Sequence, residues 1–328
     1  MAVLVTGGAG YIGSHMVLRL CDAGETVVVL DNLTTGFDWA VDSRATLVQG
    51  NAGDIDFVGA LIAKHQVKEI VHFAGSIVVP ESVTNPLKYY GNNTATSRSL
   101  IEAAVKGGVK HMVFSSTAAV YGMTGLEPVA EDTPLNPMSP YGRSKLMTEM
   151  MLADVAAAHP LTYGALRYFN VAGADPKKRS GQSSPTATHL IKVACQAALG
   201  QRPFMEIYGT DYPTPDGTCV RDYIHVSDLV EAHALLLAYL RSGGESTTLN
   251  CGYGRGYSVR QVVDMVHKVS KVDFAVREAP RRAGDPPAIV AGAQKVRALL
   301  GWQPAHDDLE EIVTSAYAWE QYLRTRNR

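Results

Sequence analysis

The sequence predicts an α/β fold in which a doubly wound parallel sheet carries a smaller C-terminal lobe. Short apolar runs rich in Val and Ile alternate with longer amphipathic segments over the first half of the chain. These runs do not alternate strictly between apolar and polar residues, which is typical of strands covered on both faces. Strands and helices in this rhythm indicate βαβ units. The expected strands are Ala2–Thr6, Thr26–Leu30, Ala45–Gln49, Glu69–Ala74, Lys110–Ser115 and Leu161–Tyr168.

Helix-length segments lie between and after these strands. The expected helices are Tyr11–Ala23, Tyr141–His159, Thr186–Leu199, Ser227–Arg241, Ser258–Val269 and Leu309–Arg324. Ser227 and Ser258 are the expected N-caps of two of them, because a serine hydroxyl can accept a hydrogen bond from the first free backbone N–H groups.

Beyond Asn170 the rhythm is interrupted by loops rich in Gly, Pro, Asp and Arg. Long loops of this kind usually form ligand sites. We therefore expect a first domain over residues 1–170 and a lobe over residues 171–328 that mainly binds substrate. A strand at Thr247–Cys251 blurs this boundary, because it could return to the main sheet.

Composition narrows the class of partner. The 328 residues include 30 Lys and Arg against 32 Asp and Glu, without a basic stripe that nucleic acid would require. The four cysteines form no CxxC pair, so neither a metal site nor a disulfide framework is expected, and reduced thiols fit the cytosol. No apolar run is long enough to cross a bilayer, and the first strand leaves no room for a signal peptide. A small metabolite and a cytoplasmic location are expected.

A glycine-rich turn follows the first strand. Gly7, Gly10 and Gly13 have the spacing GxxGxxG and open the helix that begins near Tyr11. In this context the turn lets the backbone approach a pyrophosphate, while the helix N-terminus faces the phosphates, as in Rossmann domains. Asp31 ends the second strand, where a carboxylate binds the ribose hydroxyls and repels a 2′-phosphate. The pattern predicts NAD rather than NADP.

A Tyr–Lys pair at helical spacing supplies candidate proton-transfer groups. Tyr141 and Lys145 lie on one side of a predicted helix. We expect the ammonium group to lower the pKa of the phenol, which would make Tyr141 a usable base and acid. The hydroxyl run Ser115-Ser116-Thr117 ends a buried strand, so these hydroxyls should meet this helix at the ligand crevice of the sheet.

With these motifs the chain resembles the extended short-chain dehydrogenase/reductase family, and within it the UDP-hexose 4-epimerases, over nearly its whole length. The most specific markers lie in the C-terminal half. They are Asp211-Tyr-Pro-Thr214, Asp216-Gly-Thr218 and Val220-Arg-Asp-Tyr-Ile-His-Val226. The resemblance implies reversible C4 epimerisation of UDP-galactose and UDP-glucose through a transient 4-keto sugar, with NAD tightly bound.

The resemblance also implies residue roles. Tyr141 would remove the proton from the sugar 4-hydroxyl, Thr117 would hydrogen-bond that oxygen, and Lys145 would also hold the nicotinamide ribose. The implied cofactor contacts are Gly7, Gly10, Tyr11, Ile12, Gly13, Asp31, Asn32, Asn51, Ala52, Phe73, Ala74, Gly75, Asn92, Ser115, Tyr141, Lys145 and Phe169. The implied substrate contacts are Thr117, Asn170, Leu190, Tyr208, Arg221, Arg282, Asp285 and Ile289.

Three departures from the family pattern affect specific contacts. Asn51-Ala52 stand where the family often has an Asp followed by Ile or Leu near the adenine, although an amide can still bond adenine. Ile77 replaces a Lys that some members place near the nicotinamide ribose. Ile289 matches a bulky Tyr that excludes N-acetylated sugars in some members, so the sugar pocket here is expected to be wider.

Other functions compete with this interpretation. A 4,6-dehydratase would need an Asp-Glu pair after the active-site Thr, where this chain has Ala118-Ala119. An epimerase of UDP-pentoses or UDP-N-acetylhexosamines stays open. A non-catalytic NAD-binding protein is disfavoured because Thr117, Tyr141 and Lys145 are all present. By analogy with relatives, a homodimer is expected through the helices near Pro86–Lys106 and Tyr141–His159.

Overall fold

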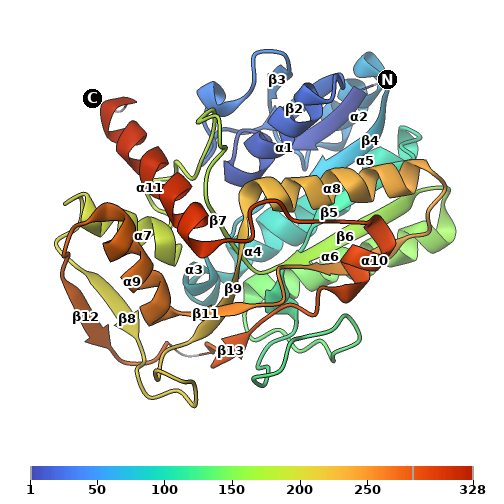
Figure 1. Cartoon of the computed structure of the whole chain (residues 1–328). Coiled ribbons are helices and arrows are strands. Elements are labelled where there is room, and N and C mark those ends of the chain that lie inside the picture. The colour runs from blue at the N-terminus through green and yellow to red at the C-terminus, as the bar shows by residue number, and fades with distance from the viewer. Residues whose placement is uncertain (1, 283, 327–328) are drawn as a thin grey trace.

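The structure is a computed structural model that describes residues 2–282 and 284–326. Its centre is a seven-stranded parallel sheet in the order β10-β6-β5-β4-β1-β2-β3 (Figure 1). The strands are β1 (Ala2–Thr6), β2 (Val27–Asp31), β3 (Thr46–Gln49), β4 (Val67–His72), β5 (His111–Ser115), β6 (Thr162–Tyr168) and β10 (Thr247–Cys251). The expected doubly wound sheet is confirmed, and the 247–251 strand does return to it by pairing with β6.

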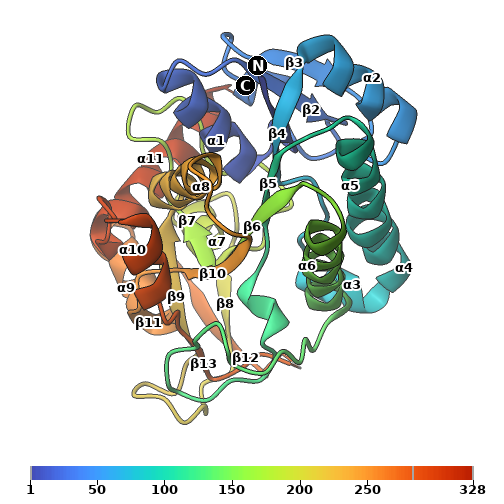
Figure 2. The same cartoon turned by 90° about the vertical axis from the view of Figure 1, so that its right-hand side faces the viewer.

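Helices cover both faces of this sheet, which explains the continuous apolar strands (Figure 2). On one face lie α1 (Tyr11–Asp22) and α8 (Val226–Arg241), and on the other lie α2 (Ile55–His65), α5 (Thr96–Lys106) and α6 (Pro140–Ala158). Successive strand residues alternate between the two layers: Val3 and Val5 belong to the core on the α1 side, and Leu4 to the core on the α2 side.

Two helix starts differ from expectation. The N-cap of α8 is His225, whose Nδ1 accepts a hydrogen bond from the backbone N–H of Ser227, so the expected Ser227 cap was wrong. The expected helix from Thr186 begins only with α7 (Leu190–Ala198). Ser258 does cap α9 (Val259–Ser270), in a capping box with Gln261.

The segment before α5 contains a non-standard helical turn. Here α3 (Val79–Thr84) and α4 (Pro86–Tyr89) lead into the π-helix η2 (Tyr90–Ala95), which continues into α5. A π-helical turn shifts the side chains that follow it and is often found at functional sites. It places Asn93 inside the protein and leaves Asn92 exposed.

The C-terminal lobe packs beside the carboxyl ends of the main strands. Its strands are β7 (Asn170–Ala172), β8 (Met205–Tyr208), β9 (Val220–His225), β11 (Gly256–Ser258), β12 (Val276–Ala279) and β13 (Ala288–Ile289), and its further helices are α10 (Gln294–Leu300) and α11 (Leu309–Arg326). The strand β9 pairs with β7, β11 and β13, and β8 pairs with β12. Within the described residues, no helix is long and apolar enough to span a membrane, and no cluster of three potential metal ligands occurs.

Candidate active site

The glycine turn between β1 and α1 is tightly constrained. Gly7 has φ +74°, and a Cβ there would lie 2.6 Å from the backbone nitrogen of Ala74. A Cβ on Gly13 would lie 2.1 Å from the carbonyl oxygen of Gly7. The N-cap of α1 is Gly10, which has no side chain, so no capping side chain accepts from the free N–H groups at the helix start. The free N–H groups and the backbone of Gly7, Gly10 and Gly13 form a cradle that suits an anionic pyrophosphate. We call it the glycine cradle.

Asp31 is joined to this turn at the end of β2. Its carboxylate accepts hydrogen bonds from the backbone N–H of Ala9 at 2.9 Å and of Leu33 at 2.8 Å. The side chain is buried, so its charge faces the turn and not open solvent. A negative charge held here repels a 2′-phosphate, which fits NAD.

The residues Phe73-Ala74-Gly75 directly follow β4, the neighbour of β1 in the sheet, and lie against the glycine turn. Asn93, from η2, holds the residue that follows: its Oδ1 accepts from the Ser76 N–H at 2.7 Å, and its Nδ2 donates to the Ser76 carbonyl at 3.0 Å. The same amide group donates to Ser144 Oγ at 3.0 Å. Sequence reasoning singled out Asn92 and missed Asn93. The sequence pattern predicts a regular helix here and gives no sign of the π-helical turn that buries Asn93.

Tyr141 and Lys145 lie in the first turns of α6. Ser139 caps this helix by accepting from the Gly142 N–H, and Pro140 suits its first turn. Both side chains are buried, with 7% of Tyr141 and 3% of Lys145 exposed. Lys145 Nζ donates to the Ser115 carbonyl at 2.9 Å, which joins the helix to the end of β5. The expected meeting of the two elements is therefore observed.

The charge balance of this pair differs from expectation. Burial raises the pKa of Tyr141, and a hydrogen bond with Thr117 opposes this increase. Burial also lowers the pKa of Lys145 to about 8, while Glu149 acts in the opposite direction. The expected lowering of the Tyr141 pKa by Lys145 was wrong for the protein alone, because desolvation of both groups dominates.

A buried ion pair lies behind the Tyr–Lys pair. Glu149 is one helical turn beyond Lys145 and accepts from Arg167 Nη2 at 2.6 Å. It also accepts from the hydroxyl of Ser116, the residue before Thr117. Arg167 donates in turn to Tyr121 Oη at 3.1 Å. The pair thus fastens α6 to the ends of β5 and β6, a role that sequence reasoning missed because the partners are distant in the chain.

Most of the substrate-side residues expected from the sequence lie on strands, helices and loops of the lobe. Arg221 lies on β9, where Nη1 donates to the Pro286 carbonyl at 2.9 Å and Nη2 lies 3.8 Å from Asp285. The Arg282 guanidinium stacks over the ring of Tyr208 at 3.7 Å. Ile289 pairs in register with Arg221. We call the charged and aromatic members of this group the lobe rim, which consists of Tyr208, Arg221, Arg282 and Asp285.

Apolar contacts connect the lobe rim to the catalytic candidates. Ile289 packs in a buried cluster with Ala118, Val120, Tyr121 and Val129, and Phe169 packs against the same cluster. Since Ala118 directly follows Thr117, Ile289 lies at the boundary between the rim and the Tyr–Lys pair. A second group of candidates lines a cavity together with residues of α11. The candidates are Tyr11, Asn170 and Leu190, and the α11 residues beside them are Trp319 and Glu320.

Other expected contacts lie at the margin. Asn32 and Asn51 are exposed, and their side chains accept backbone hydrogen bonds from Thr34 and Gly53. Ala52 belongs to the core on the α2 side. Asn92 is exposed and donates to Ser76 Oγ at 2.8 Å, and Ile77 is 50% exposed. The three asparagine side chains have different hydrogen-bond partners, so no single contact joins them.

Comparison with known proteins agrees with this geometry. Residues 3–252 match the model of the NAD dependent epimerase/dehydratase family. The chain is 57% identical over 321 residues to UDP-glucose 4-epimerase of Azospirillum brasilense, covering 98% of this chain and 92% of that one.

Two solved structures extend the comparison. The UDP-glucose 4-epimerase of Brucella ovis in complex with NAD superposes with a TM-score of 0.94 at 42% identity and 97% coverage of both chains. The UDP-Glc/GlcNAc 4-epimerase of Campylobacter jejuni has a TM-score of 0.86 at 47% identity and covers 98% of this chain and 99% of its own. With its glycine cradle, buried Tyr–Lys pair and full-length match, the chain belongs to the NAD dependent epimerase/dehydratase family.

Proposed function

We propose that this protein is a UDP-glucose 4-epimerase that interconverts UDP-glucose and UDP-galactose and keeps NAD bound throughout. The observation that carries the proposal is the meeting of Thr117, Tyr141 and Lys145 beside the glycine cradle. Ala118 and Ala119 follow this centre and bear no carboxyl group, so the acid and base that elimination of water requires are missing there.

The cofactor fits residues of the first domain, over residues 1–170. The glycine cradle and α1 would hold the pyrophosphate, and Asp31 with Asn32 would bind the adenosine ribose. Lys145, which lies close to Gly75, would hold the nicotinamide ribose. When bound, NAD would supply the hydride acceptor for C4 of the sugar. The remaining proposed contacts are Ile12, Asn51, Ala52, Phe73, Ala74, Asn92, Ser115 and Phe169.

The protein's own groups move the proton. Tyr141 as phenolate would take the proton of the sugar 4-hydroxyl and return it when the product forms. Thr117 would hydrogen-bond the same oxygen, and the Lys145 ammonium would stabilise the phenolate by its charge. Burial keeps water away from these groups, so charge interactions between them are stronger than in solvent.

The lobe, over residues 171–328, would hold the UDP part. Arg221 and Arg282 suit a diphosphate, because a guanidinium group donates in a fork that matches phosphate oxygens. Asp285 would accept from the nucleotide ribose hydroxyls, and Tyr208, Asn170 and Leu190 would border the uridine. Holding the nucleotide at the lobe rim leaves the sugar free to turn in front of Tyr141 between the two hydride transfers.

The experiment is to incubate the purified protein with UDP-galactose, without added NAD, and to measure UDP-glucose. Formation of UDP-glucose at a rate proportional to enzyme concentration is expected. If no product forms, even after NAD is supplied, the proposal is wrong. Detection of NAD in the denatured protein provides an independent check of the retained cofactor.

UDP-N-acetylhexosamines are a second candidate substrate class. Ile289 is shorter than a tyrosine and lies between the lobe rim and Ala118, which supports a sugar pocket with room for an acetamido group. The Campylobacter jejuni relative is named for both UDP-Glc and UDP-GlcNAc. Turnover of UDP-N-acetylglucosamine beside UDP-galactose tests this proposal, and no detectable turnover of the acetylated sugar contradicts it. UDP-pentoses belong in the same comparison.

We also propose a homodimer through the expected segments Pro86–Lys106 and Tyr141–His159, together with the adjacent helix α3. Large apolar side chains of this region are exposed: Leu87 by 80%, Val83 by 63%, Met150 by 59% and Met147 by 40%. The helices α3, α4 and α6 contact one another, which supports a common surface formed by these side chains. Molar mass by light scattering tests the proposal, and Leu87→Glu should shift the protein toward monomer.

A further inference from the structure

The segment Leu33–Arg44, which follows Asp31, lies across the glycine cradle. We call it the cofactor strap. The backbone N–H of Phe37 donates to the Ala9 carbonyl at 3.0 Å. Gly36 lies so close to Ala9 that a Cβ on Gly36 would approach its backbone to 2.8 Å. The strap therefore forms a wall on the side of the cradle where the adenosine half of NAD is proposed to bind.

An aromatic contact fastens the middle of the strap to α11 of the lobe. Trp39 packs between Phe37, with ring centroids 5.1 Å apart, and Trp319 of α11, at 6.5 Å. The Arg326 guanidinium lies over the Trp39 ring at 4.0 Å. Trp319 is itself held by Tyr322, whose ring lies 5.1 Å away. In Figure 1, α11 runs from the lobe toward the N-terminal half of the chain.

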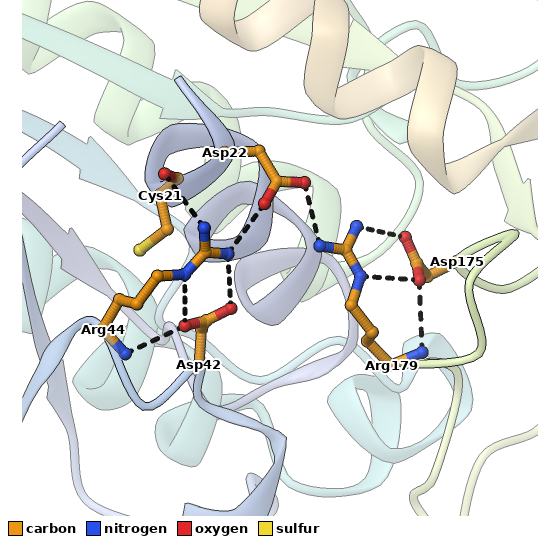
Figure 3. A network of polar contacts seen from close by, with 6 residues as sticks. All are labelled: Cys21, Asp22, Asp42, Arg44, Asp175 and Arg179. Atoms are coloured by element: carbon orange, nitrogen blue, oxygen red, sulfur yellow. Dashed lines mark hydrogen bonds and ion pairs between the residues drawn. The ribbon is translucent and has the colours of Figure 1, made fainter. Parts of the chain in front are cut away.

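A polar contact fastens the end of the strap to the lobe by a separate route (Figure 3). Arg44 and Asp42 pair within the strap, and Arg44 Nη2 donates to Asp22, at the end of α1, at 2.7 Å. Asp22 also accepts from Arg179 Nη1 of the lobe at 2.8 Å. Arg179 is fixed by Asp175 through contacts of 2.8 and 2.9 Å. Asp22 is thus the only carboxylate in Figure 3 that contacts both arginines.

We propose that these two contacts form a clasp that holds the cofactor strap closed over NAD and so slows cofactor release. The inference rests on the proposed function: an epimerase returns the hydride to its substrate, so NAD leaves each cycle unchanged and exchange serves no purpose. The residues that hold the strap in both contacts belong to the lobe: Trp319 and Arg326 on α11, and Arg179. Opening the strap therefore requires breaking contacts between residues that are far apart in the sequence.

Each fastening can be removed without touching the catalytic centre. Trp39→Ala removes the aromatic contacts, and Asp22→Asn keeps the shape of the side chain while removing the charge that joins Arg44 to Arg179. The matched controls are Phe204→Ala, which removes a similar arginine–ring contact at 3.7 Å, and Arg255→Met, which removes an exposed ion pair with Asp307. Both control sites lie outside the strap and its partners.

The measurement is exchange of bound NAD for isotopically labelled NAD, followed in the purified full-length protein, together with NAD content after gel filtration. Exchange should be about tenfold faster in Trp39→Ala and about threefold faster in Asp22→Asn, with the controls unchanged. High salt should speed exchange in the wild type but not in Asp22→Asn, because it screens the polar fastening. With saturating NAD, kcat should be unchanged.

The outcomes separate the two proposals. Wild-type rates of exchange in both variants would overturn the clasp while leaving the epimerase proposal intact. A wild-type protein that neither contains nor binds NAD would overturn both. If Trp39→Ala does not fold, the Asp22→Asn variant and the salt dependence of the wild type decide the outcome, because neither alters the protein interior.

Discussion

The Tyr–Lys pair and the lobe rim differ in how deeply their charged and polar groups are buried, and we expect different roles for them. Tyr141 and Lys145 are buried and have few polar partners, so burial raises the pKa of Tyr141 and lowers that of Lys145. On the rim, Arg282 is exposed, and the side chain of Asp285 keeps 38% of its surface accessible, so these groups stay close to water. The comparison teaches that the buried pair should determine the rate of the chemical step, whereas the rim should determine substrate affinity.

The largest expected effect comes from Tyr141→Phe. Removing the hydroxyl removes the proposed proton acceptor, and kcat should fall by about a thousandfold. NAD content and thermal unfolding should stay close to wild type, because the ring remains in place. Activity within tenfold of wild type would show that another group takes the proton.

Arg221→Met tests the other side of the comparison. Losing a charged donor to the diphosphate should raise KM by about 10- to 100-fold, corresponding to about 1.5–3 kcal/mol. The kcat value should change far less. Since Arg221 also donates to the Pro286 carbonyl, circular dichroism should accompany the kinetics. A fall in kcat at unchanged KM would contradict the division of roles.

Ile289→Tyr tests the boundary between the two regions. A tyrosine should fill the space next to Ala118 and reduce turnover of UDP-N-acetylglucosamine about tenfold. Turnover of UDP-galactose should change by less than about twofold. Equal losses on both substrates would indicate general damage to the pocket, for which Ile289→Leu serves as the control.

The smallest effect is a pH dependence. Because burial lowers the pKa of Lys145 to about 8, its ammonium loses the proton as pH rises through that value. The charge that stabilises the Tyr141 phenolate then disappears, and kcat should fall about fourfold by pH 8.5. In Lys145→Arg the side chain stays charged, so this alkaline decrease should vanish. A decrease that persists there would assign it to a different group.

The sequence was sufficient to predict the main sheet because its central strands are buried between two helical layers and each carries its own apolar signal. Even the return of Thr247–Cys251 was foreseen. Pairings within the lobe could not be predicted: β13 consists of Ala288–Ile289 alone, and its partner β9 lies far away in the chain. Such short strands depend on contacts that no local pattern encodes.

The candidate site shows the same limit. Tyr141, Lys145 and Thr117 were found because each sits at a regular position of a helix or at the end of a strand. Asn93 was missed because a π-turn changed its direction, and the Glu149–Arg167 pair because a buried charge needs a distant partner. The Tyr141 pKa was misjudged because desolvation depends on the packing of the whole site.

The placement of β10 has a consequence for synthesis of the chain. Until residue 251 has left the ribosome, β6 is the outer strand of the nascent sheet and offers unpaired backbone groups along one edge. Such an edge can pair with another chain. Translation that stops before β10 should therefore release polypeptides that aggregate, whereas interruption within α11 leaves β6 covered by β10.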